Sequence, residues 1–233
     1  MRRQFNPAEP ELMDRPQPVS SELEQDLRSI RQLNRWFGSH RLVRRFVRRW
    51  INPGDNIRVV DLATGSGDIP RLIVDRARKI GTRVEIIALD RQSATLEIAR
   101  ELSGDYPEIS FVEADILEFK PRDGYDLVLC SLALHHFSDE DAVRVLRRCR
   151  ELSHKFVLIS DLRRGWLGMI GVYLLTALIF RAAMTRYDAR LSMVRAFSFA
   201  ELDELARRAG WQRFGHQKFR FARQAIWLEK LEV

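Results

Sequence analysis

The sequence predicts an α/β fold built around a mostly parallel β-sheet, and three observations carry this prediction. Apolar segments of strand length alternate with amphipathic segments between residues 57 and 160. One apolar segment runs straight into a glycine turn and the start of a helix, at residues 59–70. Two more, near 212–219 and 222–229, close the chain and lie near enough in sequence to pair antiparallel. A chain of 233 residues has the length for one such domain with a cap.

The beginning of the chain predicts an arm followed by a helical cap. Residues 1–19 hold four prolines and little periodicity, which indicates a flexible, extended arm. Ser20 or Ser21, followed by acidic residues, opens a first helix whose apolar stripe ends at Gly38. A second helix is expected at 40–50. We therefore divide the chain into a flexible arm (1–19), cap helices (20–52) and a main domain (53–233).

In the main domain, the sequence pattern predicts five strands that alternate with helices before the closing hairpin. The strands are expected at 57–62, 83–89, 109–113, 125–131 and 155–160. The helices between them are expected at 68–80, 92–103 and 139–151. A further helix begins after Ser198 and ends at Gly210.

An uncharged, apolar run from Trp166 to Phe180 follows the fifth strand. Its length of about 15 residues is too short to span a bilayer, which needs roughly 20. We expect an inserted helical lid at about 165–195 that covers an apolar pocket. Contact with a membrane surface and contact with a second copy of the chain stay open as other roles for this run.

The charge of the chain is strongly basic, with a net charge of +7 and a sequence pI of about 9.9. This balance fits a nucleic-acid or anionic-membrane partner. A preference for Arg over Lys along the whole chain explains the same charge without any partner. The arginines on one face of the helix at 40–50 fit either a solvated surface or an acidic partner.

The cysteine content argues for a reducing compartment. Cys130 and Cys149 form neither a disulfide framework nor a metal-ligand spacing, so no metal site is expected. The N-terminus has no apolar signal segment. We therefore expect a cytoplasmic protein, with peripheral membrane contact as the one alternative.

The glycine turn at residues 61–67 reads Asp-Leu-Ala-Thr-Gly-Ser-Gly. Gly65 and Gly67 can take backbone angles closed to other residues and let a ligand approach the main chain. Pro70 replaces the third glycine of the nicotinamide fingerprint, and no phosphate-binding lysine follows, which excludes that fingerprint and a P-loop. Asp61 would repel a pyrophosphate, so the turn favours a cationic or amino-bearing ligand.

Further candidate residues follow the second and third strands, because the carboxyl ends of parallel strands share one edge of a sheet. Asp90 lies about 25 residues after the glycine turn, which is near the spacing of a ribose-binding acid, and Arg91 follows it. Asp115 can accept a hydrogen bond from an adenine amino group while Ile116 packs on the ring. Each of these acids could instead be a simple helix cap or turn residue.

The turn at 61–67 resembles the first motif of class I S-adenosylmethionine-dependent methyltransferases, in which an acid precedes small residues. Ala63 stands where that family most often has glycine. The resemblance covers roughly residues 57–159 and implies a Rossmann-like, seven-stranded sheet in the order 3-2-1-4-5-7-6, with the last strand antiparallel. It implies S-adenosylmethionine as cofactor and S-adenosylhomocysteine as product, held by Asp61, Ala63, Thr64, Gly65, Gly67, Asp90, Arg91, Asp115, Ile116, Cys130 and Ser131.

His135 and His136 follow the fourth strand, near the place where the resemblance puts the reacting methyl group. A histidine can take a proton from an acceptor at neutral pH. A histidine pair on this loop resembles the small-molecule methyltransferases of ubiquinone and menaquinone biosynthesis. That likeness implies methyl transfer to oxygen or an activated ring carbon of a phenolic, quinone-like or polyketide-derived acceptor. Candidate acceptor contacts are Arg163, Trp166 and Tyr187.

Nucleic acid is not the expected partner. The loop after the fourth strand lacks the Asp/Asn-Pro-Pro-aromatic run of nucleic-acid amino methylases, and Cys130 follows Leu129 rather than the proline of cytosine-C5 enzymes. Two other functions stay open: an RNA or protein methyltransferase that uses the Arg-rich faces, and a catalytically silent cofactor-binding or membrane-associated protein. The expected partner is a small-molecule acceptor, and the expected assembly is a monomer or a homodimer.

Overall fold

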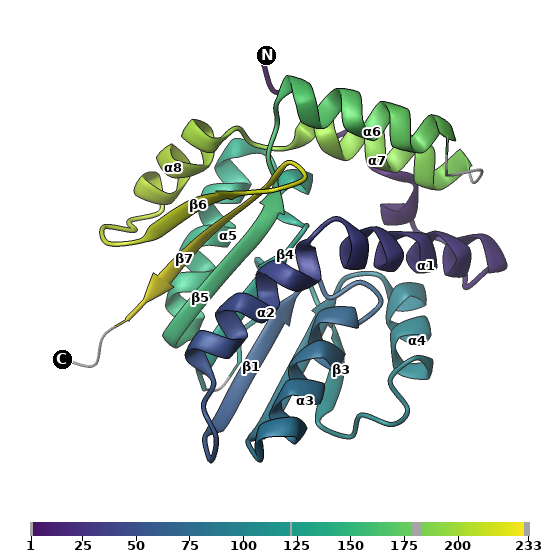
Figure 1. The fold of residues 1–233 in the computed structure, drawn as a ribbon. Coiled ribbons are helices and arrows are strands. Elements are labelled where there is room, and N and C mark those ends of the chain that lie inside the picture. Colours follow the sequence, from purple (N-terminus) through teal and green to yellow (C-terminus); the bar gives the residue numbers. More distant parts are fainter. Residues whose placement is uncertain (1, 122, 179–182, 231–233) are drawn as a thin grey trace.

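A seven-stranded sheet forms the centre of the part of the chain that the structure describes. The structure is a computed structural model, and it describes residues 2–121, 123–178 and 183–230 (Figure 1). The strands lie in the order β3-β2-β1-β4-β5-β7-β6. Neighbouring strands from β3 to β5 are parallel, whereas β7 runs antiparallel to both β5 and β6. The order that the family resemblance implies is confirmed.

The strands agree with the sequence prediction, apart from their ends. They are β1 (Asn56–Leu62), β2 (Arg83–Asp90), β3 (Ile109–Glu113), β4 (Tyr125–Ser131), β5 (Ser153–Leu162), β6 (Gly215–Phe219) and β7 (Arg223–Glu229).

The start of β6 differs most from its expected position. The strand begins at Gly215, three residues later than the expected start at 212. Trp211 is buried instead, and its indole N–H donates to the backbone oxygen of Leu146, 3.1 Å away. Gly215 is the first residue of the strand, and a Cβ there would lie 2.1 Å from the ring of Trp227. Tertiary packing of the two tryptophans therefore sets this boundary.

Helices cover both faces of the sheet. Val59 and Val60, adjacent in β1, belong to opposite hydrophobic clusters, as the alternation of a strand requires. The Val59 face packs against α2 (Ser39–Trp50) and α3 (Asp68–Ile80), and the Val60 face packs against α5 (Asp139–Leu152) and α8 (Phe199–Arg208). The remaining long helices near the sheet are α1 (Ser21–Trp36) and α4 (Ser93–Glu101). Ser20 caps α1, since its side chain accepts from the backbone N–H of Leu23.

Two helices of the predicted lid lie above the carboxyl edge of the sheet (Figure 1). They are α6 (Trp166–Leu178) and α7 (Ala183–Arg195), and residues 179–182 of the expected lid lie outside the described residues. Among the described residues, no helix is both long enough and apolar enough to cross a membrane.

The N-terminal arm runs between the lid and the sheet edge. It contains one turn of 3-10 helix, η1 (Leu12–Asp14), whose first two backbone N–H groups donate to the carboxylate of Asp188 in α7 at 2.7 and 3.1 Å. The guanidinium of Arg195 donates to the backbone oxygens of Asn6 and Glu9. The flexibility of this arm stays a prediction, but its contacts place it beside the candidate site.

Candidate active site

A cavity of about 1030 Å³ lies at the carboxyl edge of the parallel strands. Its walls come from the loops after β1, β2, β3 and β4, from α1, from the lid, from the β6–β7 hairpin and from the N-terminal arm. Twelve of the predicted site residues line it: Asp61, Ala63, Thr64, Gly65, Asp90, Arg91, Asp115, Ile116, Ser131, His135, His136 and Arg163. The fold therefore brings most of the candidate residues of both halves of the predicted site into one space.

Asp61, at the end of β1, is the most deeply buried acid at the glycine turn, with 1% of its surface exposed. Its Oδ2 accepts a hydrogen bond from the Thr64 hydroxyl at 2.8 Å, while its Oδ1 is buried without a partner. Burial raises the pKa of Asp61 to about 7. A buried carboxylate oxygen without a donor on a cavity wall fits a ligand that brings an ammonium group.

The glycine turn is held between β1 and β2 by its own backbone. The N–H of Thr64 donates to the carbonyl of Leu89 at 2.8 Å, and the N–H of Gly65 donates to Asp90 Oδ2 at 2.9 Å. Ala63 has a φ of 60°, in the left-handed region that glycine enters without strain. Alanine therefore replaces the family's usual glycine at a backbone position that it can adopt only with strain.

Gly67 belongs to the turn without lining the cavity. A Cβ at this position would lie 3.2 Å from both Phe111 and Arg71, and its φ is 71°. The residue is glycine because the turn packs closely against the β3 side of the sheet, so its predicted cofactor contact stays a prediction.

The acids after β2 and β3 also act within the protein. Asp90 accepts from the N–H groups of Gly65 and Gln92, and burial raises its pKa despite these hydrogen bonds. Asp115 accepts from the N–H of Leu117 at 2.7 Å, and Ile116 beside it is buried. Both acids therefore shape their loops while they line the cavity, and their roles toward ribose and adenine stay predictions.

His135 lies in a short 3-10 helix, η2 (Leu134–His136), and is held by Asp161 at the end of β5. Its Nδ1 lies 2.7 Å from Asp161 Oδ1, and its backbone N–H donates to Asp161 Oδ2 at 3.0 Å. Burial alone would raise the pKa of Asp161, but the charge and hydrogen bond of His135 outweigh it and leave that pKa below its usual value. An ionised Asp161 accepts a hydrogen bond from Nδ1–H, so in the neutral form of the ring the lone pair of His135 is on Nε2.

His136 is held by two acids of the N-terminal arm. Its Nδ1 lies 2.6 Å from Asp14 Oδ2. Burial would lower the pKa of His136, but Glu11 and Asp14 outweigh it and raise that pKa to about 10. His136 therefore carries a positive charge at neutral pH.

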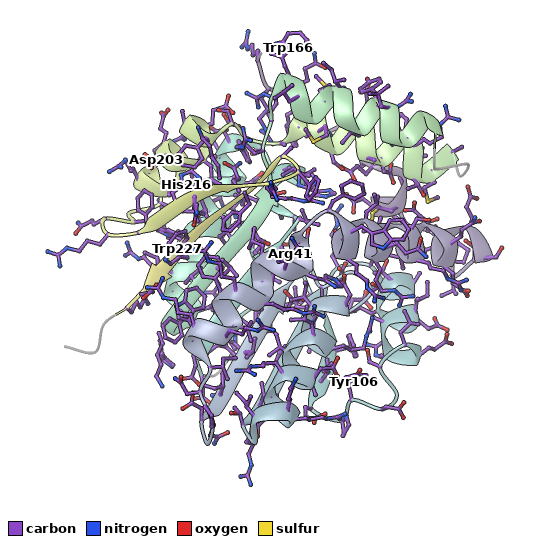
Figure 2. The ribbon with its side chains drawn as sticks, viewed as in Figure 1. Arg41, Tyr106, Trp166, Asp203, His216 and Trp227 are labelled. Carbon is purple, nitrogen blue, oxygen red and sulfur yellow. The ribbon has the colours of Figure 1, made fainter. Side chains whose placement is uncertain are left out.

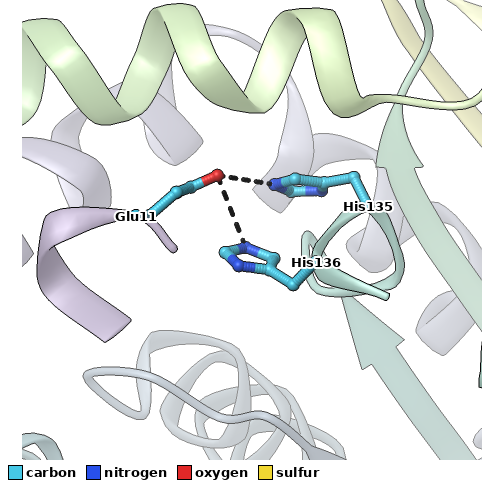
Figure 3. A group of neighbouring side chains, drawn as sticks. All are labelled: Glu11, His135 and His136. Carbon is cyan, nitrogen blue, oxygen red and sulfur yellow. Dashed lines mark ion pairs between the residues drawn. The ribbon is translucent and has the colours of Figure 1, made fainter. Parts of the chain in front are cut away.

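Glu11 faces both histidines (Figure 3). Its Oε1 lies 3.7 Å from His135 Nε2 and 3.9 Å from His136 Nε2, and 2% of the residue is exposed. The three side chains offer ligand atoms within 4.8 Å of one another, a spacing that a metal ion could bridge. The proton on His136 provides a positive charge at the same place.

Three residues of this cluster escaped the sequence analysis. Glu11 and Asp14 lie in the arm, where no motif or periodicity distinguishes them. Asp161 carried a usable signal, because it is an acid at a strand end like Asp61 and Asp90.

Three predicted site residues lie outside the cavity lining, besides Gly67. Cys130 is fully buried within β4, and burial raises the pKa of its thiol well above the usual value. Trp166 is 69% exposed at the start of α6 and points away from the sheet (Figure 2). Tyr187 in α7 is 43% exposed. Their predicted contacts with cofactor or acceptor stay predictions, and the described arrangement offers them no place in the cavity wall.

Residues 59–155 match a family described as a methyltransferase domain. The 2-phytyl-1,4-naphtoquinone methyltransferase of Trichormus variabilis is 30% identical over 138 residues, which cover 55% of this chain and 58% of that protein. The demethylmenaquinone methyltransferase of Thermotoga maritima is 38% identical over 95 residues, which cover 41% of this chain and 38% of that protein. The matched part of the chain thus spans less than two thirds of the length of these curated relatives.

Solved methyltransferase structures share the fold over most of the chain. Magnesium protoporphyrin IX methyltransferase from Synechocystis PCC 6803, solved with bound SAH, has a TM-score of 0.57 and 17% identity, covering 92% of this chain and 90% of that one. The plantazolicin methyltransferase BpumL has a TM-score of 0.65 and 12% identity, covering 91% of this chain and 92% of that one. At these identities the likeness is one of fold alone.

Proposed function

We propose that this chain transfers a methyl group from S-adenosylmethionine to a small, largely apolar acceptor. Its residues 59–155 match a methyltransferase domain, and its sheet has the strand order of the class I methyltransferase fold. One observation carries the proposal. A single cavity contains Asp61, whose buried Oδ1 has no partner, and His135, whose Nε2 is left as a proton acceptor. A donor that brings an ammonium group and an acceptor that loses a proton can thus meet in one space.

The cofactor half of the proposed site is the set of loops after β1, β2 and β3. Asp61 would accept from the ammonium group of the methionine part, and Asp90 from the ribose hydroxyls. Asp115 and Ile116 would hold the adenine. When bound, S-adenosylmethionine supplies a methyl group activated by a neutral sulfur leaving group.

The histidine pair serves the acceptor in two different ways. His135 takes the acceptor's proton on Nε2, because Asp161 keeps the other ring nitrogen protonated. His136, already protonated between Glu11 and Asp14, cannot be the base at neutral pH. It instead stabilises the negative charge that develops on the acceptor.

The acceptor is proposed to be phenolic or quinone-like, with oxygen or an activated ring carbon as the methylated atom. Support comes from the curated relatives, whose names describe methylation of naphthoquinones and menaquinone precursors. The cavity wall formed by the lid adds apolar side chains such as Leu167, Val172 and Met193. Arg163 lines the same space and stays a candidate acceptor contact.

The test is a panel of phenols and quinols incubated with labelled S-adenosylmethionine, with products identified by mass spectrometry. The wild-type chain should bind the cofactor by calorimetry and methylate at least one class of acceptor. Asp90→Ala should lose cofactor affinity, and unchanged affinity would show the ribose assignment to be wrong.

The histidine assignment has its own test. His135→Ala should lower kcat by about 10²- to 10⁴-fold, the usual range for loss of a general base, with cofactor affinity retained. His136→Ala should also lower kcat. The matched control is His154→Ala, at an exposed histidine outside the cavity lining. Full activity of both cavity variants would eliminate the assignment. Dialysis against a chelator should leave wild-type activity unchanged, because the proton of His136 provides the positive charge.

A further inference from the structure

Two arginines lie at neighbouring backbone positions where β5 and β7 meet at the cavity. Arg223 is the first residue of β7 and pairs with Leu162, the last residue of β5. Arg163 follows Leu162, and its backbone N–H donates to the carbonyl of Ala222 at 2.7 Å. Both arginines line the cavity.

Arg223 is a buried cation with one long hydrogen bond and no ion pair among the described residues. Only 7% of the residue is exposed, and its Nε reaches the carbonyl of Phe37 at 3.5 Å, a long hydrogen bond. Within the described part of the chain, neither arginine has a carboxylate within ion-pair distance. Asp161 is the acid whose charge acts on Arg223, but its oxygens already accept from His135 and Leu162.

Arg163 is only half-buried, but its Nε is buried without a partner. Two other buried arginines nearby show the contrast. Arg164 pairs with Glu201 at 2.6 Å and donates to the carbonyl of Ala196. Arg195 donates from Nη2 to two backbone oxygens of the arm, although its Nε has no partner. Arg223 is therefore the exception among the buried arginines of this region, and the half-buried Arg163 lies at the neighbouring strand end.

A buried guanidinium without an anion destabilises the ligand-free protein. Burial lowers the pKa of Arg223 to about 10, so the guanidinium stays protonated at neutral pH. Its positive charge therefore stays without a compensating anion in the ligand-free protein. The planar guanidinium fork matches the two oxygens of a carboxylate. Such strain at a cavity wall points to a ligand that relieves it.

We propose that Arg223 and Arg163 form a carboxylate-binding site for a ligand of this cavity. Its carboxylate has two sources, and the inference rests on the proposed function because both belong to ligands of that reaction. One source is the methionine carboxylate of the cofactor, since Arg223 contacts Phe37 at the end of α1. His40 of α2 follows closely in the chain, and its Nε2 lies 2.7 Å from Asp68 at the start of α3, beside the glycine turn. The other is a carboxylate on the acceptor, since Asp161 and His135 lie on the neighbouring strand end.

The first arm of the test measures cofactor binding by calorimetry. S-adenosylhomocysteine and its decarboxylated analogue are titrated into the wild-type chain, Arg223→Gln and Arg223→Lys. If the carboxylate is the cofactor's, Arg223→Gln should bind S-adenosylhomocysteine about 10- to 100-fold more weakly, with unchanged affinity for the analogue. Arg223→Lys should lose less, because it keeps the charge but not the fork.

The second arm titrates 4-hydroxybenzoate and 4-hydroxybenzamide into the chain saturated with S-adenosylhomocysteine. If the carboxylate is the acceptor's, Arg223→Gln should keep its S-adenosylhomocysteine affinity and lose the wild-type preference for the benzoate over the benzamide. Arg163→Gln should weaken binding of the same ligand that Arg223→Gln weakens, either S-adenosylhomocysteine or 4-hydroxybenzoate. Arg213→Gln, at an exposed arginine outside the cavity lining, is the matched control and should change neither.

Thermal unfolding of the ligand-free variants separates a ligand site from a structural one. Removing an unpaired buried charge should raise the Tm of Arg223→Gln above that of the wild type, whereas loss of a structural ion pair would lower it. The proposal is wrong if neither the affinity for S-adenosylhomocysteine nor the affinity for 4-hydroxybenzoate depends on Arg223. If the wild-type chain binds no S-adenosylhomocysteine at all, the proposed function fails instead, and the two failures are thus distinguishable.

Discussion

At the scale of the residue, burial sets the charge state of the side chains in the cavity. Asp61 and Asp161 are both carboxylates at strand ends, with 1% and 3% of their surfaces exposed. Asp61 meets only a hydroxyl, so burial raises its pKa, whereas Asp161 meets His135, whose charge and hydrogen bond lower its pKa. The same residue type is therefore prepared for two roles: to receive a ligand's cation, and to orient a histidine.

The raised pKa of Asp61 predicts that cofactor affinity depends on pH. The ammonium group of the cofactor needs the ionised carboxylate, so with a pKa of about 7 the affinity should be about tenfold weaker at pH 6 than at pH 8. Calorimetric titrations of S-adenosylhomocysteine across this range measure it. Asp61→Asn should bind more weakly at pH 8 and lose the pH dependence. A wild-type affinity that stays constant between these pH values would contradict the assignment.

The same pKa has a consequence for the stability of the ligand-free protein. The folded pKa of Asp61 lies above its usual value of 3.8, so between these two values the folded state binds more protons than the unfolded state. The contribution of Asp61 to the free energy of unfolding is therefore full below pH 3.8 and decreases as pH rises to about 7. Binding of a cation at Asp61 opposes this loss.

Asp161 is a positioning residue, and its substitution should affect catalysis without affecting cofactor binding. Asn at position 161 no longer requires the proton of His135 on Nδ1, so Nε2 would be protonated in part of the molecules. We expect Asp161→Asn to lower kcat by about 10²- to 10⁴-fold and to leave the calorimetric affinity for S-adenosylhomocysteine within about twofold. A shift of the acidic limb of the kcat–pH profile should accompany the loss. An unaltered profile would identify Asp161 as structural only.

At the scale of the element, the N-terminal arm completes the site. It brings Glu11 and Asp14 to the histidine pair, and Arg3 holds it to the η2 loop and α7. The Nη2 of Arg3 donates to the carbonyls of His135 and Phe137 at 3.1 and 2.7 Å, and its Nε donates to the carbonyl of Arg195 at 2.6 Å. The arm therefore covers the acceptor half of the cavity.

Loosening the arm should weaken acceptor binding more than cofactor binding. Arg3→Gln removes the charge that binds three carbonyl groups and Asp139, and we expect the acceptor KM to rise about tenfold. Limited proteolysis should cut the arm faster than in the wild type. Arg2→Gln is the control, because Arg2 is exposed beside it. Equal KM values for wild type and Arg3→Gln would mean that the arm does not act on the acceptor.

The outer face of α6 is the second element with a testable consequence. Ile170 and Leu174 are 53% and 58% exposed, lie outside the cavity lining and belong to a helix without charged residues. An apolar face of this kind on a basic protein is suited to an anionic membrane surface. We expect the wild type to float with vesicles that contain phosphatidylglycerol, and the double serine variant at these two positions to remain unbound. Leu102→Ser, at an exposed leucine after α4, should float like the wild type, and a wild type that does not float would remove membrane contact from the proposal.

At the scale of the whole molecule, one sheet edge collects candidate ligand-binding groups from the ends of five parallel strands, from the N-terminal arm and from β7. The carboxyl ends of β1, β2, β3 and β4 carry the cofactor candidates, and those of β4 and β5 carry the histidine loop and Asp161. Buried charges at this edge, such as Asp61 and Arg223, strain the ligand-free fold. Ligand binding should therefore stabilise the whole molecule.

Thermal unfolding measures that coupling. At a S-adenosylhomocysteine concentration of 100 times the Kd, the free energy of unfolding should rise by about 2.7 kcal/mol, which corresponds to a Tm increase of about 5 to 10 °C for a chain of this size. Asp90→Ala should show a smaller increase at the same concentration. Glu204→Ala, at an exposed acid of α8, should show the full increase. No shift of the wild-type Tm at any concentration would contradict cofactor binding.

The sequence by itself determined the strands and helices and, through the family resemblance, the order of the strands and the candidate cofactor residues. These follow from local patterns: alternation of apolar residues gives the elements, and residues 61–67, Asp90 and Asp115 lie next to strands whose ends share one edge. Once the order of the strands is known, residues that follow neighbouring parallel strands are known to lie close together in space.

Only the tertiary structure decided which charges meet at the acceptor half. His136 and Asp14 lie 122 positions apart in sequence and 2.6 Å apart in space, and the arm that carries Asp14 has no periodicity to reveal it. The exposed position of Trp166 and the unpaired state of Arg223 likewise depend on what packs around them. The physical reason is that burial and pairing are properties of the assembled surroundings, and local sequence patterns contain only the nearest neighbours along the chain.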